Sequence, residues 1–367
     1  MSVIYKEFAT YNGLNFVKDG LNFNNYKALI FDIDGTLIDS RLSYNETIYD
    51  TVSIFYQSIT GFKPEREQIN EAIIKLRLTG GFNNDWDSTY AILIGLYSGL
   101  PDEVLKLVSS NDYKFFRSTI KLKLNKESIA ESSYKALNYL LMFADSNGLN
   151  SIEAGLQKLY NKKDKLDYLQ KIKLKLNYPN LPTKSLLSKV FEEIYLGTDL
   201  FKEIWNIEPI FKIKRGLIEN ERVNLDNDVK VFLKKRFSDK IGIASGRPKK
   251  AALKSLADLM GNFFNENASF FVDDAYKDSK DVWLGKPNPY LLIKSMESMN
   301  VKSCIYVGDS FEDLLMVNNA IKEGYDVAFV GTYSFSPNPQ LYIKKFIEKG
   351  ADAVIPTINE LKFLLSF

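Results

Sequence analysis

The chain contains no histidine and a single cysteine, Cys304, among its 367 residues. These two shortages exclude Ser-His-Asp triads, zinc clusters of Cys and His, and HExxH sites. Any catalysis therefore has to use Asp, Glu, Lys, Ser or Tyr side chains. One cysteine cannot form a disulfide within the chain, which suits a reducing compartment.

Long hydrophobic runs and a strong net charge are also missing. The longest apolar stretch, YAILIGLYSGL at 90–100, is too short to cross a bilayer. The N-terminus has no basic region followed by an apolar core, so it does not predict a signal peptide. A net charge of +2 gives no strong attraction to nucleic acid. We therefore expect a cytoplasmic protein with no membrane partner, and nucleic acid is disfavoured as a partner.

Apolar segments that each end in a polar turn predict the strands of a parallel sheet. They are KALIFD at 27–32, KIGIASG at 240–246, ASFFVDD at 268–274, SCIYVGD at 303–309 and YDVAFVG at 325–331. Continuous apolar runs of this kind are typical of strands buried on both faces. Helical patterns lie between them, for example at 249–260 and 311–324. The alternation predicts an α/β fold with a doubly wound, mainly parallel sheet that binds ligands beyond the carboxyl ends of its strands.

The segment 41–236 interrupts this alternation, because its apolar residues recur at helical spacing. We interpret it as a large, mostly α-helical cap domain inserted after the first strand of a core formed by 26–40 and 237–367. Residues 1–25 are an N-terminal extension to which the sequence assigns no role. Two domains are expected at this length, since single cores seldom exceed roughly 250 to 300 residues.

Four short motifs end or follow the predicted strands. They are FDIDGT with Asp32 and Asp34, IASGRP with Ser245 and Gly246, GKPNP with Lys286, and VGDSFED with Asp309 and Asp313. Carboxylates as close as the first pair raise each other's pKa unless a cation intervenes, so the pair predicts a cation nearby. Each motif alone is common as a turn, a helix cap or a surface lysine. Their shared place at strand ends favours one functional site.

In type and order these motifs resemble those of the haloacid dehalogenase (HAD) superfamily, in particular subfamily I phosphatases with an inserted helical cap. The resemblance covers the whole chain in layout, although the inserted segment is longer than the cap usual in that subfamily. It implies a HAD-like core and Mg²⁺ as the cofactor. It also implies a phosphoric monoester hydrolase that acts on a small phosphorylated metabolite through a covalent aspartyl-phosphate on Asp32.

The acidic residues have side chains that suit this reaction. Asp32 can attack phosphorus, and Asp34 can protonate the leaving oxygen and later activate a water. Mg²⁺ prefers oxygen ligands, which the Asp32 and Asp309 carboxylates and the Asp34 backbone carbonyl can supply. Asp313 lies one helical turn after Asp309 and is expected to act through a bound water.

The remaining motif residues are expected to bind the phosphoryl group. Gly35 allows a tight turn and a close approach of the backbone. Lys286 offers positive charge beside the nucleophile, while Ser245 and the Gly246 amide offer hydrogen bonds. The sequence thus predicts catalytic roles for Ser245 and Lys286 as well as phosphate binding.

A polar stretch in the inserted segment, GGFNNDWD at 80–87, has two interpretations. Its candidates for substrate specificity are Asn83, Asn84, Asp85 and Trp86. Their amides and indole could recognise hydroxyls or a ring of the substrate. Alternatively, Asn84 or Asp85 is the N-cap of the next helix. The sequence favours neither.

Other functions are compatible with the same core. A sugar phosphomutase, a nucleic-acid 3′-phosphatase and a non-catalytic HAD-like binding module are the alternatives, and the sequence assigns no oligomeric state. Only the lysine-rich segment 157–190 favours nucleic acid, and a solvated helix face explains it better. Dehalogenation is disfavoured, because it has no leaving alkoxide for Asp34 to protonate.

Overall fold

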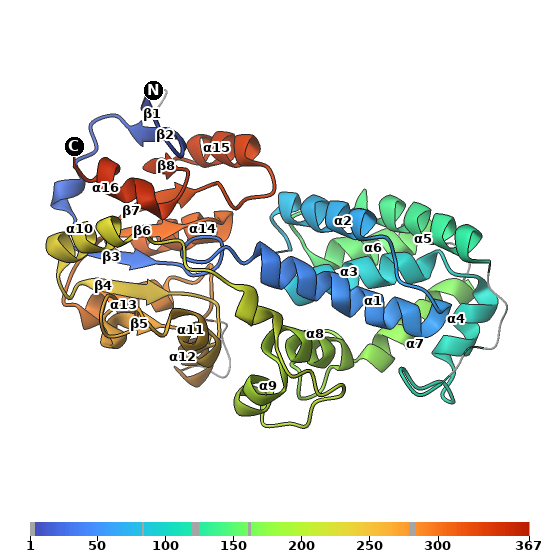
Figure 1. Ribbon diagram of the computed structural model, residues 1–367. Helices are drawn as coiled ribbons and strands as arrows, with labels where there is room; N and C mark the ends of the chain where they lie inside the picture. Colours follow the sequence, from blue (N-terminus) through green and yellow to red (C-terminus); the bar gives the residue numbers. More distant parts are fainter. Residues whose placement is uncertain are drawn as a thin grey trace. The chain divides into compact units, whose positions relative to one another are not determined.

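A computed structural model describes residues 4–82, 84–118, 120, 125–160, 163–278 and 284–366. The chain divides into two compact units (Figure 1). The core unit comprises Met1–Arg41 and Glu221–Phe367, and the inserted unit comprises Leu42–Asn220.

Among the described residues of the core unit, eight strands form one sheet in the order β1-β2-β8-β7-β6-β3-β4-β5. Their bounds are β1 Tyr5–Thr10, β2 Gly13–Lys18, β3 Ala28–Phe31, β4 Ile241–Ala244, β5 Ser269–Phe270, β6 Ser303–Gly308, β7 Asp326–Thr332 and β8 Ala353–Ile355. Strands β3 to β8 pair in parallel, whereas β1 and β2 form an antiparallel hairpin that joins the edge of β8. The predicted α/β fold with a mainly parallel sheet is confirmed, and each of the five predicted strands is present.

The strand order reverses at β3. Ile30 in β3 is in register with Gly242 of β4 on one side and with Tyr306 of β6 on the other. From β3 the chain adds β4 and β5 on one side and then β6 and β7 on the opposite side. In doubly wound sheets the crevice at such a reversal, beyond the carboxyl ends of the strands, is where ligands bind.

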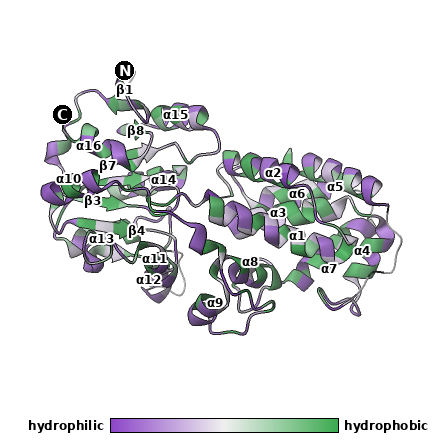
Figure 2. Cartoon of the chain, in the orientation of Figure 1, coloured by the Kyte–Doolittle hydropathy of each residue, from purple (hydrophilic) through white to green (hydrophobic). Residues whose placement is uncertain are grey.

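Helices cover both faces of the sheet (Figure 1). The core helices are α10 Asn227–Phe237, α11 Lys249–Leu256, α12 Val272–Asp278, α13 Tyr290–Ser298, α14 Phe311–Lys322, α15 Pro339–Glu348 and α16 Leu361–Leu364. One face, which carries Leu29 and Phe31, packs against α10, α11 and α16 in a single hydrophobic cluster. Most helices carry a hydrophobic and a hydrophilic stripe (Figure 2), as expected for helices that bury one side.

The structure corrects two expectations about the domains. Helix α10 was assigned to the cap within 41–236, but its Val229, Leu233 and Phe237 belong to the hydrophobic cluster of the core sheet. The inserted unit therefore ends at Asn220. The prediction was wrong because an amphipathic helix has the same periodicity whether it covers a sheet or another helix. The expected extension 1–25 contains β1 and β2, so part of it belongs to the sheet.

The secondary structure described within the inserted unit is entirely helical. The helices are α1 Glu46–Thr60, α2 Arg66–Thr79, α3 Asp85–Ser98, α4 Asp102–Ser109, α5 Lys126–Leu141, α6 Leu149–Leu159, α7 Lys163–Leu176, α8 Leu186–Leu196 and α9 Thr198–Trp205. Helix α3 packs against α1, α2, α5 and α8, and it is buried all round from Ser88 to Ser98. This burial explains the longest apolar stretch of the sequence. No helix in the described part of the chain is both long and apolar enough to cross a membrane.

Candidate active site

Three aspartates meet at the carboxyl ends of β3 and β6, where the strand order reverses. Asp32 directly follows β3, Asp309 directly follows β6, and Asp313 lies in the first turn of α14. One carboxylate oxygen of each lies within 4.8 Å of the others. The structure therefore brings Asp32 together with Asp309 and Asp313, two predicted residues that lie far from it in the sequence.

Lys286 supplies a cation to this cluster. Its Nζ lies 2.6 Å from Asp32 Oδ1 and 2.6 Å from Asp313 Oδ1, and its side chain is only 8% exposed. Burial lowers the pKa of Lys286, but the carboxylates of Asp313 and Asp32 outweigh burial and raise it well above its usual range. The lysine is therefore charged, and it neutralises part of the acidic cluster.

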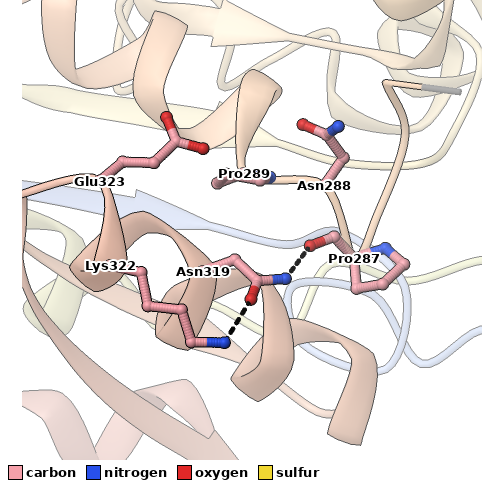
Figure 3. Close-up of a pocket in the computed structure, with 6 residues that line it drawn as sticks. All are labelled: Pro287, Asn288, Pro289, Asn319, Lys322 and Glu323. Carbon is pink, nitrogen blue, oxygen red and sulfur yellow. Dashed lines mark hydrogen bonds between the residues drawn. The ribbon is translucent and has the colours of Figure 1, made fainter. Parts of the chain in front are cut away.

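The loop that carries Lys286 is held by α14. Asn319 Nδ2 donates a hydrogen bond to Pro287 O at 3.1 Å, and Lys322 Nζ donates one to Asn319 Oδ1 at 3.1 Å (Figure 3). The same residues line a pocket of about 450 Å³ together with Asn288, Pro289 and Glu323. Because α14 also carries Asp313, one helix positions both partners of the ion pair.

Asp313 is fixed by four hydrogen-bonding groups. Its Oδ2 accepts from Ser310 N at 3.1 Å and from Ser310 Oγ at 2.7 Å. The first of these bonds and the bond from Asp313 N to Ser310 Oγ form a capping box at the start of α14. Asp313 Oδ1 accepts from Lys286, and the Tyr306 hydroxyl lies 3.0 Å away. Gly308 permits this arrangement, since a Cβ there would lie 2.6 Å from Asp313 Cγ. The Asp313 side chain is therefore held in place by protein groups, and its expected metal role through a bound water stays a prediction.

Gly35 shapes the turn after β3. Its φ of 68° lies in the left-handed region that favours glycine. Its amide donates to Ile38 O at 2.9 Å, which closes the turn. A Cβ on Gly35 would collide with the carboxylate of Asp309. The close backbone approach expected of this glycine is thus made to a carboxylate of the site.

The acidic cluster has the properties of a cation site. Burial raises the pKa of Asp32 to about 6; Lys286 opposes this rise, and Asp313 and Asp34 add to it. Burial and the carboxylates of Asp313 and Asp32 raise the pKa of Asp309 well above its usual range. Within the described residues, no hydrogen bond or ion pair reaches the Asp309 carboxylate. A partly buried carboxylate in this position, beside a second one, fits a hard divalent cation such as Mg²⁺.

Asp34 has a cation of its own, which the sequence interpretation missed. Arg247 Nε donates to Asp34 Oδ2 at 3.1 Å, and Arg247 Nη2 donates to Asp34 Oδ1. The sequence predicted a cation near the two aspartates of the first motif, with Lys286 beside the nucleophile. The structure assigns Lys286 to Asp32 and the Arg247 guanidinium to Asp34.

Ser245 and Gly246 lie at the same edge of the sheet, because they follow β4, the neighbour of β3. The Ser245 side chain is buried, and its Oγ accepts from Arg247 N at 3.3 Å. Gly246 is exposed, with open space where a Cβ would stand. Their predicted contacts with a phosphoryl group stay predictions.

The predicted specificity residues belong to the inserted unit. Asn83 lies outside the described residues. Asn84 is the N-cap of α3, where its Oδ1 accepts from Trp86 N at 2.9 Å, as one of the two interpretations required. Asp85 pairs with Arg77 at 3.0 Å. The Trp86 indole donates to Glu192 Oε1 at 3.0 Å, so these side chains have structural partners while their role in specificity stays a prediction.

Sequence reasoning overlooked four residues around the site. They are Arg247, Glu221, Ser255 and Tyr306. Arg247 stood in a quoted motif, IASGRP, without a role. A charged residue directly after a buried strand was the available signal, because buried arginines require partners. Nothing in the sequence pointed to Glu221 or Ser255.

Fold and site together define the class: the chain has an α/β core with an inserted helical unit, which agrees with the resemblance to the HAD superfamily seen in the sequence. The model of the haloacid dehalogenase-like hydrolase family matches residues 208–320. This part of the chain, which contains Ser245, Lys286, Asp309 and Asp313, is therefore similar to HAD-like hydrolases.

Solved structures were also compared with the chain, and the first of those described below shares its fold. A crystal structure from the Northeast Structural Genomics Consortium is 20% identical, with a TM-score of 0.66, covering 93% of this chain and 98% of that one. A phosphatase from Thermococcus thioreducens is 19% identical, with a TM-score of 0.47, covering 88% of this chain and 99% of that one. A predicted phosphatase from Clostridium acetobutylicum is 13% identical, with a TM-score of 0.39, covering 93% and 99%. No curated protein matches the chain.

Proposed function

We propose that this chain is a Mg²⁺-dependent phosphatase that hydrolyses a small phosphorylated metabolite through a covalent aspartyl-phosphate on Asp32. The observation that carries the proposal is the cluster of Asp32, Asp309 and Asp313 around Lys286 at the reversal of strand order. The match to a hydrolase family supports it. A cytoplasmic location and the absence of a nucleic-acid partner belong to the same proposal.

Each proposed step uses a residue of the chain. An Asp32 oxygen attacks phosphorus, the bond from phosphorus to the leaving oxygen breaks, and Asp34 gives that oxygen a proton. A water then attacks the aspartyl-phosphate and passes a proton to Asp34, which releases inorganic phosphate and restores Asp32. Lys286 and the amide of Gly246 stabilise charge on the phosphoryl oxygens.

The donor set fits Mg²⁺. Asp32 and Asp309 would bind it through carboxylate oxygens, the Asp34 carbonyl would complete the protein ligands, and Asp313 would orient the site. When bound, the ion supplies positive charge for the phosphoryl oxygens. The two carboxylates with raised pKa are the groups that such a charge would stabilise most.

The test compares Asp32→Asn with a matched aspartate variant. Asp273 lies in the first turn of α12, shortly after β5, and its Oδ2 accepts from Lys249 N at 2.5 Å at the start of α11. With p-nitrophenyl phosphate and Mg²⁺, we expect Asp32→Asn to abolish turnover and Asp273→Asn to retain it. Acid quenching should trap labelled phosphate on the wild type but not on Asp32→Asn. Retained turnover in Asp32→Asn would refute the role of Asp32 as the nucleophile. If the wild type is active, a panel of phosphorylated metabolites would identify its substrate.

A further inference from the structure

Arg247 has a fully buried charged side chain next to the site. Its side chain is 0% exposed, and it directly follows the Ser-Gly turn at the end of β4. A buried arginine is tolerated only when its five N–H groups are paired. The hydrogen-bond partners of this guanidinium therefore indicate the role of Arg247.

All five N–H groups of Arg247 have acceptors. Nε and Nη2 form a fork on the two oxygens of Asp34. Nη1 and Nη2 donate to Glu221 Oε2 and Oε1 at 2.7 and 2.9 Å. Nη1 also donates to Ser255 Oγ at 3.0 Å, and that hydroxyl donates to Glu221 Oε2 at 2.6 Å. The guanidinium is thus held from one side by Glu221 and Ser255 and presents its other side to Asp34.

Burial differs sharply between the two acids. The Glu221 side chain is 2% exposed, whereas that of Asp34 is 30% exposed. The Glu221 and Ser255 side of the network is therefore the anchored part, and Asp34 is the part that solvent and substrate can reach. A planar fork fixes a carboxylate in orientation as well as in position.

We infer that Arg247 is the positioning residue for Asp34, and that Glu221 and Ser255 hold Arg247 in place for this task. The inference rests on the proposed function, because the proposed function assigns Asp34 the role of general acid and base. Glu221 is the first residue of the core unit after the inserted unit. The anchor of the network is therefore placed where the chain returns to the core.

The test uses coupling between substitutions. Asp34→Asn should slow phenyl phosphate, a poor leaving group, by about 10²-fold or more, and p-nitrophenyl phosphate much less. Arg247→Met should reproduce this selectivity in kcat/KM, and Arg247→Lys should restore part of it. The double variant Asp34→Asn/Arg247→Met should be no slower than Asp34→Asn alone, since residues that act through one another are not additive. Losses that multiply, or that are equal for both substrates, would overturn the inference.

A structural control and a second variant keep the result decisive. Arg236 donates to Leu365 O and Phe23 O, away from the site residues, so Arg236→Met should lower stability without changing leaving-group selectivity. If Arg247→Met does not fold, Arg247→Met/Glu221→Leu removes both buried charges and takes its place. A crystal structure of either variant should show the Asp34 carboxylate turned from its present orientation, and an unchanged orientation refutes the inference whatever the activity. Activity retained by Asp32→Asn would instead refute the proposed function.

Discussion

Replacing Lys286 by Met tests whether one buried cation holds the acidic cluster together. The substitution keeps most of the side-chain volume but removes the charge that lies 2.6 Å from both Asp32 and Asp313. Removing one partner of a buried ion pair costs about 3–5 kcal/mol, because the other charge stays buried without compensation. Two carboxylates about 5 Å apart then repel each other by about 3 kcal/mol at an effective dielectric constant of about 20.

These magnitudes predict a large change in melting temperature. For a unit of this size each kcal/mol corresponds to about 2–4 °C, so Tm in EDTA should fall by about 6–20 °C. In the wild type, Lys286 lowers the pKa of Asp32, so loss of the lysine should raise this pKa further. A carboxyl with a raised folded-state pKa destabilises the fold as pH rises, so the loss in Tm should be smaller near pH 5 than near pH 8. Mg²⁺ should restore more of the Tm in Lys286→Met than it adds to the wild type.

The assay is thermal unfolding of both proteins with EDTA or MgCl₂ at the two pH values. A matched control is Lys362→Met, because Lys362 pairs with Asp228 at 2.7 Å on an exposed surface. An exposed pair at nearly the same distance contributes little, so this variant should melt close to the wild type. An unchanged Tm in Lys286→Met, or the same response of both variants to Mg²⁺, would contradict the reasoning.

Two further predictions concern buried groups. Burial raises the pKa of Glu192 to about 7, against the effect of two indole donors. Because this folded-state pKa exceeds the unfolded one, about 3 kcal/mol of stability is lost as pH rises through about 4.5 to 7. Urea unfolding followed by tryptophan fluorescence should show this loss in the wild type and a flatter profile in Glu192→Gln; a flat wild-type profile contradicts it. Gly308→Ala places a methyl group against Asp313 and should cost about 1–3 kcal/mol, whereas Gly246→Ala meets open space and should leave Tm nearly unchanged, as thermal unfolding would show.

The sheet was predictable where strands were apolar and continuous. All five predicted runs contain a strand, because burial in a sheet leaves a local signal in the sequence, although the run 268–274 contains only the short β5 and then enters α12. Strands β1 and β2 were not predicted, since this edge hairpin is mostly exposed or only partly buried and has several polar residues, so it has no continuous apolar run. Strand β8 has only three residues, Ala353–Ile355, which is too short for a pattern to be read.

The site was predictable to the level of residue types at strand ends. The gathering of Asp32, Asp309 and Asp313 followed from their place after β3 and β6, because parallel strands bring their carboxyl ends to one edge. The capping box that fixes Asp313 was also accessible from its position three residues after Ser310. The partner of Asp34 was not accessible, because Arg247 lies 213 residues away and no local rule joins them.

The sequence by itself determined which chemistry the chain excludes, which segments form the parallel sheet and which carboxylates meet at its edge. Each of these depends on local order: composition, apolar runs and the residue that follows a strand. Only the tertiary structure decided that α10 belongs to the core, that Lys286 pairs with Asp32 and Asp313, and that Arg247 joins Asp34 to Glu221. Pairing between distant side chains depends on distances of a few ångströms in the folded chain, and these are set by packing rather than by neighbours in the sequence.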